Sequence, residues 1–292
     1  MRIPFSLILA SSLLIGLPSV QAEMVWSKKP SSGKMGGMQH GGMSGQATNK
    51  GKKSGGAMNH RRGKTFYLSD SVGASIVMLK PNLEEKEITL KGKNGKLNVP
   101  STGVDNYHAL VATRVEDQLH ESAIRYVYMR GKPSKVSPTK LVESDKFPLE
   151  IIPEPYVRGH RRYLSNDSIK LRVDFKGEPL ANAWVGLSTS NGSKLEANTD
   201  SEGRVSFIFP DDFKNVRPGR SKNPAGEFIL RTGISTEGML YRTNLAAPYS
   251  TDPSHWESMN AGLFLMIGGI ITGLLIMRRE KPKKIVKKRK AA

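Results

Sequence analysis

The chain has 292 residues, a net charge of +19 and no cysteine. Without cysteine, the protein has no disulfide, no thiolate metal site and no cysteine nucleophile. The excess of Lys and Arg lies mainly in residues 23–64 and after Met277, whereas the region between them carries nearly balanced charge. This leaves no basic face for nucleic acid on the expected folded region, so nucleic acid is excluded as its partner.

The N-terminus has the pattern of a secretory signal peptide. Arg2 precedes an apolar stretch over residues 5–17, and the small-residue site Val20-Gln21-Ala22 follows. We predict a signal peptide over residues 1–22 that is cleaved after Ala22. The alternative is an uncleaved membrane anchor, for which the apolar stretch is short.

Residues 23–64 form a low-complexity segment rich in Gly, Ser, Lys and Met. Such a composition buries too little apolar surface to fold, so we expect a disordered arm. The arm combines thioether and imidazole donors, which makes it a candidate transition-metal site. The predicted ligands are Met35, Met38, His40, Met43, Met58 and His60.

The donor types in the arm favour one metal over others. Thioether sulfur is a soft ligand that selects Cu(I), while imidazole also serves nickel, zinc and Cu(II). Copper, as Cu(I), is therefore the first candidate for the bound ion, and nickel or cobalt is the next. The alternative is that the arm is only a spacer.

The region between the arm and residue 248 has short apolar runs separated by Gly, Asn and Pro, the pattern of β-strands and turns. We predict an all-β fold with two β-sandwich-like modules. The first module covers residues 65–153, a basic and aromatic linker loop covers 154–166, and the second module covers 167–248.

The second module has the clearest period-two alternation in the chain. Ile169, Leu171, Val173 and Phe175 alternate with polar residues, and residues 205–209 repeat the pattern. Such alternation predicts strands with one buried face. Helix is expected only in the signal peptide and near the C-terminus.

Three further histidines are weaker candidates for metal binding. His108 lies in a predicted strand, His120 in a polar turn and His160 in the linker loop. Each of them is more often a surface or hydrogen-bonded histidine than a metal ligand.

The C-terminus has the pattern of a membrane anchor. After a juxtamembrane segment over residues 249–258, an uncharged apolar run covers residues 259–277, and a basic tail covers 278–292. As a helix the run would extend roughly 28 Å, close to the hydrocarbon thickness of a bilayer. The positive flank predicts a cytoplasmic tail and a periplasmic N-terminal ectodomain at the inner membrane, with the tail near membrane lipid.

No nucleophile elbow, phosphate-binding loop, dinucleotide fingerprint or zinc-protease helix is present, so we expect a protein that is not an enzyme. Three stretches, PLEIIP (148–153), LRVDFKGEPLANA (171–183) and TDSEGRVSF (199–207), resemble a bacterial periplasmic nickel/cobalt-uptake accessory family. The resemblance implies immunoglobulin-like modules related to carboxypeptidase regulatory domains. Glu23 stands where that family has a histidine soon after the signal-peptide cleavage site.

Two functions from different classes fit these features. The first is a membrane-anchored periplasmic accessory protein that binds a transition metal and delivers it to a membrane transporter or periplasmic partner. The second is a non-catalytic structural or protein-interaction module, in which the arm is only a tether.

Overall fold

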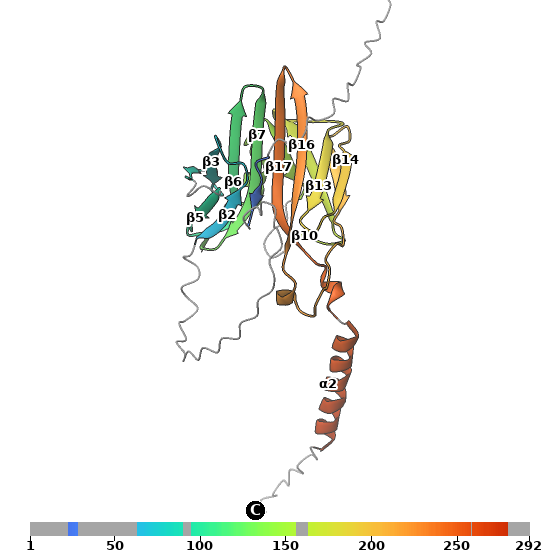
Figure 1. Cartoon of the computed structure of the whole chain (residues 1–292). Coiled ribbons are helices and arrows are strands. Elements are labelled where there is room, and N and C mark those ends of the chain that lie inside the picture. The colour runs from blue at the N-terminus through green and yellow to red at the C-terminus, as the bar shows by residue number, and fades with distance from the viewer. Residues whose placement is uncertain (1–22, 29–62, 90–94, 156–162, 258, 280–292) are drawn as a thin grey trace, which may run out of the picture.

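The computed structural model describes residues 23–28, 63–89, 95–155, 163–257 and 259–279. Of the residues that the structure describes, 49% are in strands and 14% in helices, which confirms the prediction of a mostly β fold. The strands form an elongated body of packed sheets, from which one C-terminal helix projects (Figure 1).

The first β module packs a small sheet against the strands of a larger one. The small sheet contains β1 (Trp26–Ser27), β2 (Lys64–Leu68) and β5 (Lys96–Val99). The larger sheet contributes β3 (Ser75–Leu79), β4 (Glu85–Glu87), β6 (Val104–Glu116), β7 (Leu119–Met129) and the short β8 (Lys132–Pro133). Buried apolar side chains from both sheets form its core, among them Trp26, Phe66, Met78, Leu97 and Leu110.

The second β module is also built from two facing sheets. One sheet contains β9 (Leu149–Pro153), β11 (Ser168–Phe175), β12 (Glu178–Pro179) and β15 (Arg204–Ile208). The other contains β10 (Tyr163–Leu164), β13 (Trp184–Thr189), β14 (Lys194–Asn198), β16 (Gly226–Thr236) and β17 (Met239–Ser250). Val205, Phe207 and Phe209 are buried whereas Ile208 is 66% exposed, which confirms the predicted alternation.

The two modules share one continuous sheet of ten strands. β17 of the second module pairs in parallel with β7 of the first, from Leu240 opposite Leu119 to Leu245 opposite Ile124. The core of the second module accordingly includes Val111 and Ile124 from β6 and β7. The two modules therefore share a sheet and a hydrophobic core, and are not independent domains joined by a flexible linker.

Two segments near the predicted boundary belong to this shared core. β9, which the sequence places at the end of the first module, pairs antiparallel with β11, with Leu149 opposite Phe175. The short helix α1 (Pro138–Glu143) buries Leu141 and Val142 in the same core. The prediction that helix occurs only in the signal peptide and near the C-terminus is therefore wrong, since this short helix packs against β6 and β9.

The C-terminal helix α2 (Met259–Arg279) follows a short 3-10 turn, η3 (Pro253–His255), and extends away from the body (Figure 1). Its apolar side chains between Leu263 and Met277 are exposed. Within the described ranges, no helix meets the length and apolarity required to cross a membrane. The predicted transmembrane helix over residues 259–277 is therefore not supported.

Candidate functional site

Most of the predicted metal ligands lie outside the described residues, which leave out 29–62 and 156–162. They are Met35, Met38, His40, Met43, Met58, His60 and His160. The structure does show how the segment that carries the first six is attached to the body.

The predicted arm is not a free N-terminal extension. β1 and β2 pair antiparallel, with Trp26 opposite Leu68 and Ser27 opposite Tyr67. Neighbouring strands lie about 4.8 Å apart. Residues 29–62 therefore connect two adjacent strands and form a loop that is closed at its base. We call residues 29–62 the metal loop.

The N-terminal part of the predicted arm, residues 23–28, is folded, which corrects the sequence-based boundary. Met24 and Trp26 are 0% exposed and belong to the core of the first module. The indole Nε1 of Trp26 donates a hydrogen bond to the carbonyl oxygen of Ala123, at 3.1 Å. The sequence did not predict the burial of these two residues, because they lie in a segment of low-complexity composition. Only their contacts in the tertiary structure distinguish them from the rest of the predicted arm.

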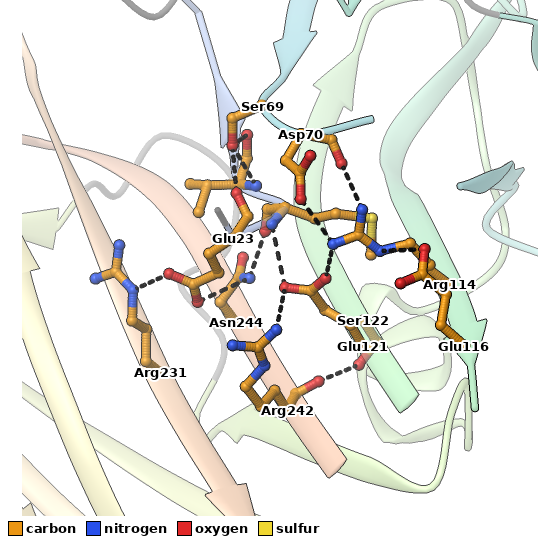
Figure 2. A network of polar contacts seen from close by, with 12 residues as sticks. Glu23, Ser69, Asp70, Arg114, Glu116, Glu121, Ser122, Arg231, Arg242 and Asn244 are labelled. Atoms are coloured by element: carbon orange, nitrogen blue, oxygen red, sulfur yellow. Dashed lines mark hydrogen bonds and ion pairs between the residues drawn. The ribbon is translucent and has the colours of Figure 1, made fainter. Parts of the chain in front are cut away.

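A polar network fixes the same N-terminal segment to both modules (Figure 2). The Glu23 carboxylate accepts a hydrogen bond from Nε of Arg231, at 2.5 Å. The side-chain amide of Asn244 donates to the carbonyl oxygen of Met24, at 2.6 Å. The backbone N–H of Met24 donates to Glu121, at 3.2 Å. The segment is therefore held by groups on β7, β16 and β17.

Glu121 is the centre of this network and is 0% exposed. One of its oxygens lies 2.5 Å from Nη2 of Arg114, and the other lies 3.6 Å from Nη2 of Arg242. The same Nη2 of Arg114 lies 2.8 Å from the Asp70 carboxylate. Burial alone would lower the pKa of Arg114, but its bonds to Asp70 and Glu121 outweigh burial and raise the pKa. Arg114 is thus a permanently charged cross-link.

The position of the network gives it a structural task. Arg242 and Glu121 are register partners where β17 pairs with β7, the junction of the two modules. Ser122, next along β7, donates to the hydroxyl of Thr243 at 3.0 Å across the same junction. Buried charges require such pairing, because an unpaired charge in the interior is strongly unfavourable. The network therefore stabilises the junction and the base of the metal loop together.

The sequence analysis missed Arg114 and Glu121 as a pair. They are direct partners in the β6–β7 hairpin, which turns at residues 117–118. The signal that could have found them is the equal spacing of two opposite charges on either side of the turn at residues 117–118. Cross-strand partners of opposite charge stabilise a hairpin.

His108 is buried in β6 and both of its ring nitrogens have partners. Nε2 lies 2.8 Å from the hydroxyl of Thr102, and Nδ1 lies 3.1 Å from the carbonyl oxygen of Asn106. Burial lowers the pKa of His108, so the ring is neutral at pH 7. These contacts are those of a hydrogen-bonded core histidine.

His120 lies at the start of β7, near the opposite end of the hairpin from His108. Its ring stacks at a tilt on Tyr241, with 5.6 Å between centroids. Burial also lowers the pKa of His120. In the part of the chain that the structure describes, no three His, Asp or Glu residues gather in a group that could hold a metal ion. The structure therefore does not bring His108 and His120 together.

Comparison with known proteins gives only distant structural likenesses. No protein-family model matches the chain, and no curated protein matches it. The D0-D1 domain of Intimin is similar over 64% of this chain and 91% of its own, with 11% identity and a TM-score of 0.23. The D00-D0 domain of Intimin is similar over 65% and 93%, with 13% identity and a TM-score of 0.22.

A third likeness is to the apo structure of Bacteroides uniformis beta-glucuronidase 3. It covers 66% of this chain and 22% of the enzyme, with 10% identity and a TM-score of 0.19. At TM-scores of this size the three likenesses add nothing to the description of the sheets given above. None of them concerns a nickel/cobalt-uptake accessory family, so that resemblance has no further support.

Proposed function

We propose that this protein is a periplasmic accessory protein that binds a transition metal, first of all Cu(I), in the metal loop and passes it to a membrane transporter or periplasmic partner. The observation that carries the proposal is the pairing of β1 with β2, which fixes both ends of the loop on the folded body. A Met- and His-rich segment that was attached to the body at only one end would not have the position of its other end fixed.

The closed base matters because the donors fall into two groups. Met35, Met38, His40 and Met43 lie in the first part of the loop, and Met58 and His60 lie near its end. Fixing both ends of a flexible segment raises the effective concentration of one group near the other. Glycines between the donors allow the backbone to wrap around an ion.

The cellular site that we propose is the periplasmic face of the inner membrane. The exposed apolar side chains of α2 are unfavourable in water and are covered in a lipid environment. The basic tail after Met277 favours the cytoplasmic side. On this proposal the β body lies in the periplasm and α2 holds it at the membrane.

We expect Cu(I) to bind residues 23–257 in preference to Zn(II), because thioether donors outnumber imidazoles in the metal loop. Changing Met35, Met38 and Met43 together to leucine keeps side-chain volume and removes three donors, so Cu(I) affinity should fall at least tenfold. Competition with a chromophoric Cu(I) chelator measures it. Met239→Leu, a half-buried methionine of β17, is the matched control and should bind like the parent.

Equal Cu(I) affinity in the parent and the triple variant would identify the loop as a spacer. The interaction-module function would then be the better one. The pH dependence offers a second check on the donor set. Protonation below pH 6 removes His40 and His60 but not the four thioethers, so affinity should fall only moderately there.

A reporter that is active only in the cytoplasm should give signal when fused after Ala292, because the basic tail favours that compartment. A reporter that is active only in the periplasm should be silent at the same position. The matched fusion replaces the basic residues of 278–290 by glutamine and should lose the cytoplasmic preference. Periplasmic signal from the unchanged tail would overturn the proposed orientation.

A further inference from the structure

The loop between β15 and β16 carries a run of unpaired positive charge. We call residues 211–225 the basic loop. After Asp212 it contains Lys214, Arg217, Arg220 and Lys222 and no acidic residue. All four basic side chains are exposed, and none has a carboxylate partner among the described residues. Exposed cationic side chains without an ion-pair partner are available to bind an anion from outside the protein.

The basic loop has a defined shape that fixes where these charges lie. The Asn223 side chain accepts a hydrogen bond from the backbone N–H of Arg217 at 2.9 Å and donates to its carbonyl oxygen at 2.7 Å. It also donates to the carbonyl oxygen of Gly219, at 3.1 Å. The 3-10 turn η2 (Arg220–Lys222) lies between Arg217 and Asn223, the residues that these hydrogen bonds join. Arg217, Arg220 and Lys222 are therefore presented together on one short turn.

The base of the basic loop is anchored in the second module. The Asp212 carboxylate accepts hydrogen bonds from the hydroxyls of Tyr249 and Thr189, each at 2.5 Å. Burial would raise the pKa of Asp212, but these bonds outweigh it and lower the pKa. Phe213 packs on the ring of Tyr249, with 4.8 Å between centroids. The loop is thus a fixed feature of this end of the body.

The basic loop lies beside the start of the C-terminal helix. Asp211 is 3.0 Å from Nε2 of His255, the last residue of η3, and α2 begins at Met259. In Figure 1 the short turn of the loop lies at the end of the body from which α2 projects. Four unpaired cations and an exposed apolar helix therefore meet at one end of the molecule.

We propose that the basic loop binds the phosphate groups of anionic lipid headgroups at the membrane surface that α2 contacts. The inference rests on the proposed membrane association of α2 and is independent of metal binding. A lipid surface is favoured over an acidic protein segment because it offers both of the chemistries found here, anionic phosphate and hydrocarbon. Basic side chains near an anionic bilayer each strengthen binding, within about a Debye length of the surface.

The test uses residues 23–257, because neither core contains a residue of α2 and partitioning of this part reports the basic loop without the apolar helix. Co-sedimentation with vesicles of phosphatidylcholine, with and without phosphatidylglycerol, measures partitioning. The variant K214Q/K222Q removes two exposed charges whose side chains have no ion-pair partner among the described residues. Partitioning to the anionic vesicles should fall by roughly 20- to 30-fold, at about fivefold per charge.

The matched control is K86Q/K96Q, which changes net charge equally at two exposed lysines of the first module. It should keep vesicle binding within about twofold of the parent, and neither variant should change Cu(I) affinity. Equal loss in both variants, or no loss in K214Q/K222Q, would overturn the proposal. Loss of binding to poly-glutamate with unchanged vesicle binding would overturn it too, in favour of an acidic protein partner.

Discussion

Trp26→Ala should destabilise the protein by about 3–5 kcal/mol, because it removes a fully buried indole from the core of the first module. It also deletes the hydrogen bond to Ala123. Urea unfolding followed by far-UV circular dichroism measures the free energy of unfolding. The matched control is Trp184→Ala, whose indole is 37% exposed on β13 and should change stability by less than about 1 kcal/mol.

The same variant tests the link between the fold and the metal loop. Trp26 holds β1 beside β2, so its loss should loosen the base of the loop and lower Cu(I) affinity in protein that is still folded. A Trp26→Ala protein as stable as the parent would mean that β1 is not part of the core. Unchanged Cu(I) affinity with reduced stability would mean that closure of the loop does not contribute to binding.

Glu121→Ala should cost about 3–5 kcal/mol, because it removes the buried carboxylate that pairs with the buried Arg114 and with the half-buried Arg242. Glu116 is the matched control. It lies 3.7 Å from the same Arg114, but its side chain is 59% exposed, so Glu116→Ala should cost about 0–1 kcal/mol. Thermal and urea unfolding of the two variants compare a buried and an exposed partner of one arginine.

A Glu121→Gln variant separates charge from shape. Glutamine keeps the volume and can still accept the hydrogen bond from the N–H of Met24, so it should recover part of the loss but not the pairing of the two arginines. If Glu121→Ala were no more destabilising than Glu116→Ala, the junction of the modules would rest on its backbone pairing and apolar core alone.

The strands of the second module are the part of the fold that local sequence predicts best. Period-two alternation identified the inward faces of residues 169–173 and 205–209, because each strand buries one face in a common core. It was wrong at the end of β11, where Asp174 is buried and Phe175 is only partly buried. The pattern says which face is inside, but not which strand lies beside which. β9 illustrates the difference. Its apolar sequence fits a strand of either module, and its pairing with β11 places it in the second module.

The candidate site was predictable only in part. Composition alone pointed to thioethers and imidazoles in residues 29–62 as candidate metal donors, a prediction that stands beside the alternative of a spacer. It gave no sign that Met24 and Trp26 are buried, or that the segment begins and ends on neighbouring strands. His108 and His120 were weak candidates by type, and their positions along β6 and β7 keep them apart.

By itself the sequence determined the β class, the inward faces of its clearest strands and the two concentrations of positive charge. These are properties of residue type and of spacing over a few residues. Only the tertiary structure decided the parallel pairing of β7 with β17, the burial of Glu121 at that junction and the closure of the metal loop by β1 and β2. Each of these depends on contacts between residues far apart in the chain, and no local periodicity encodes them.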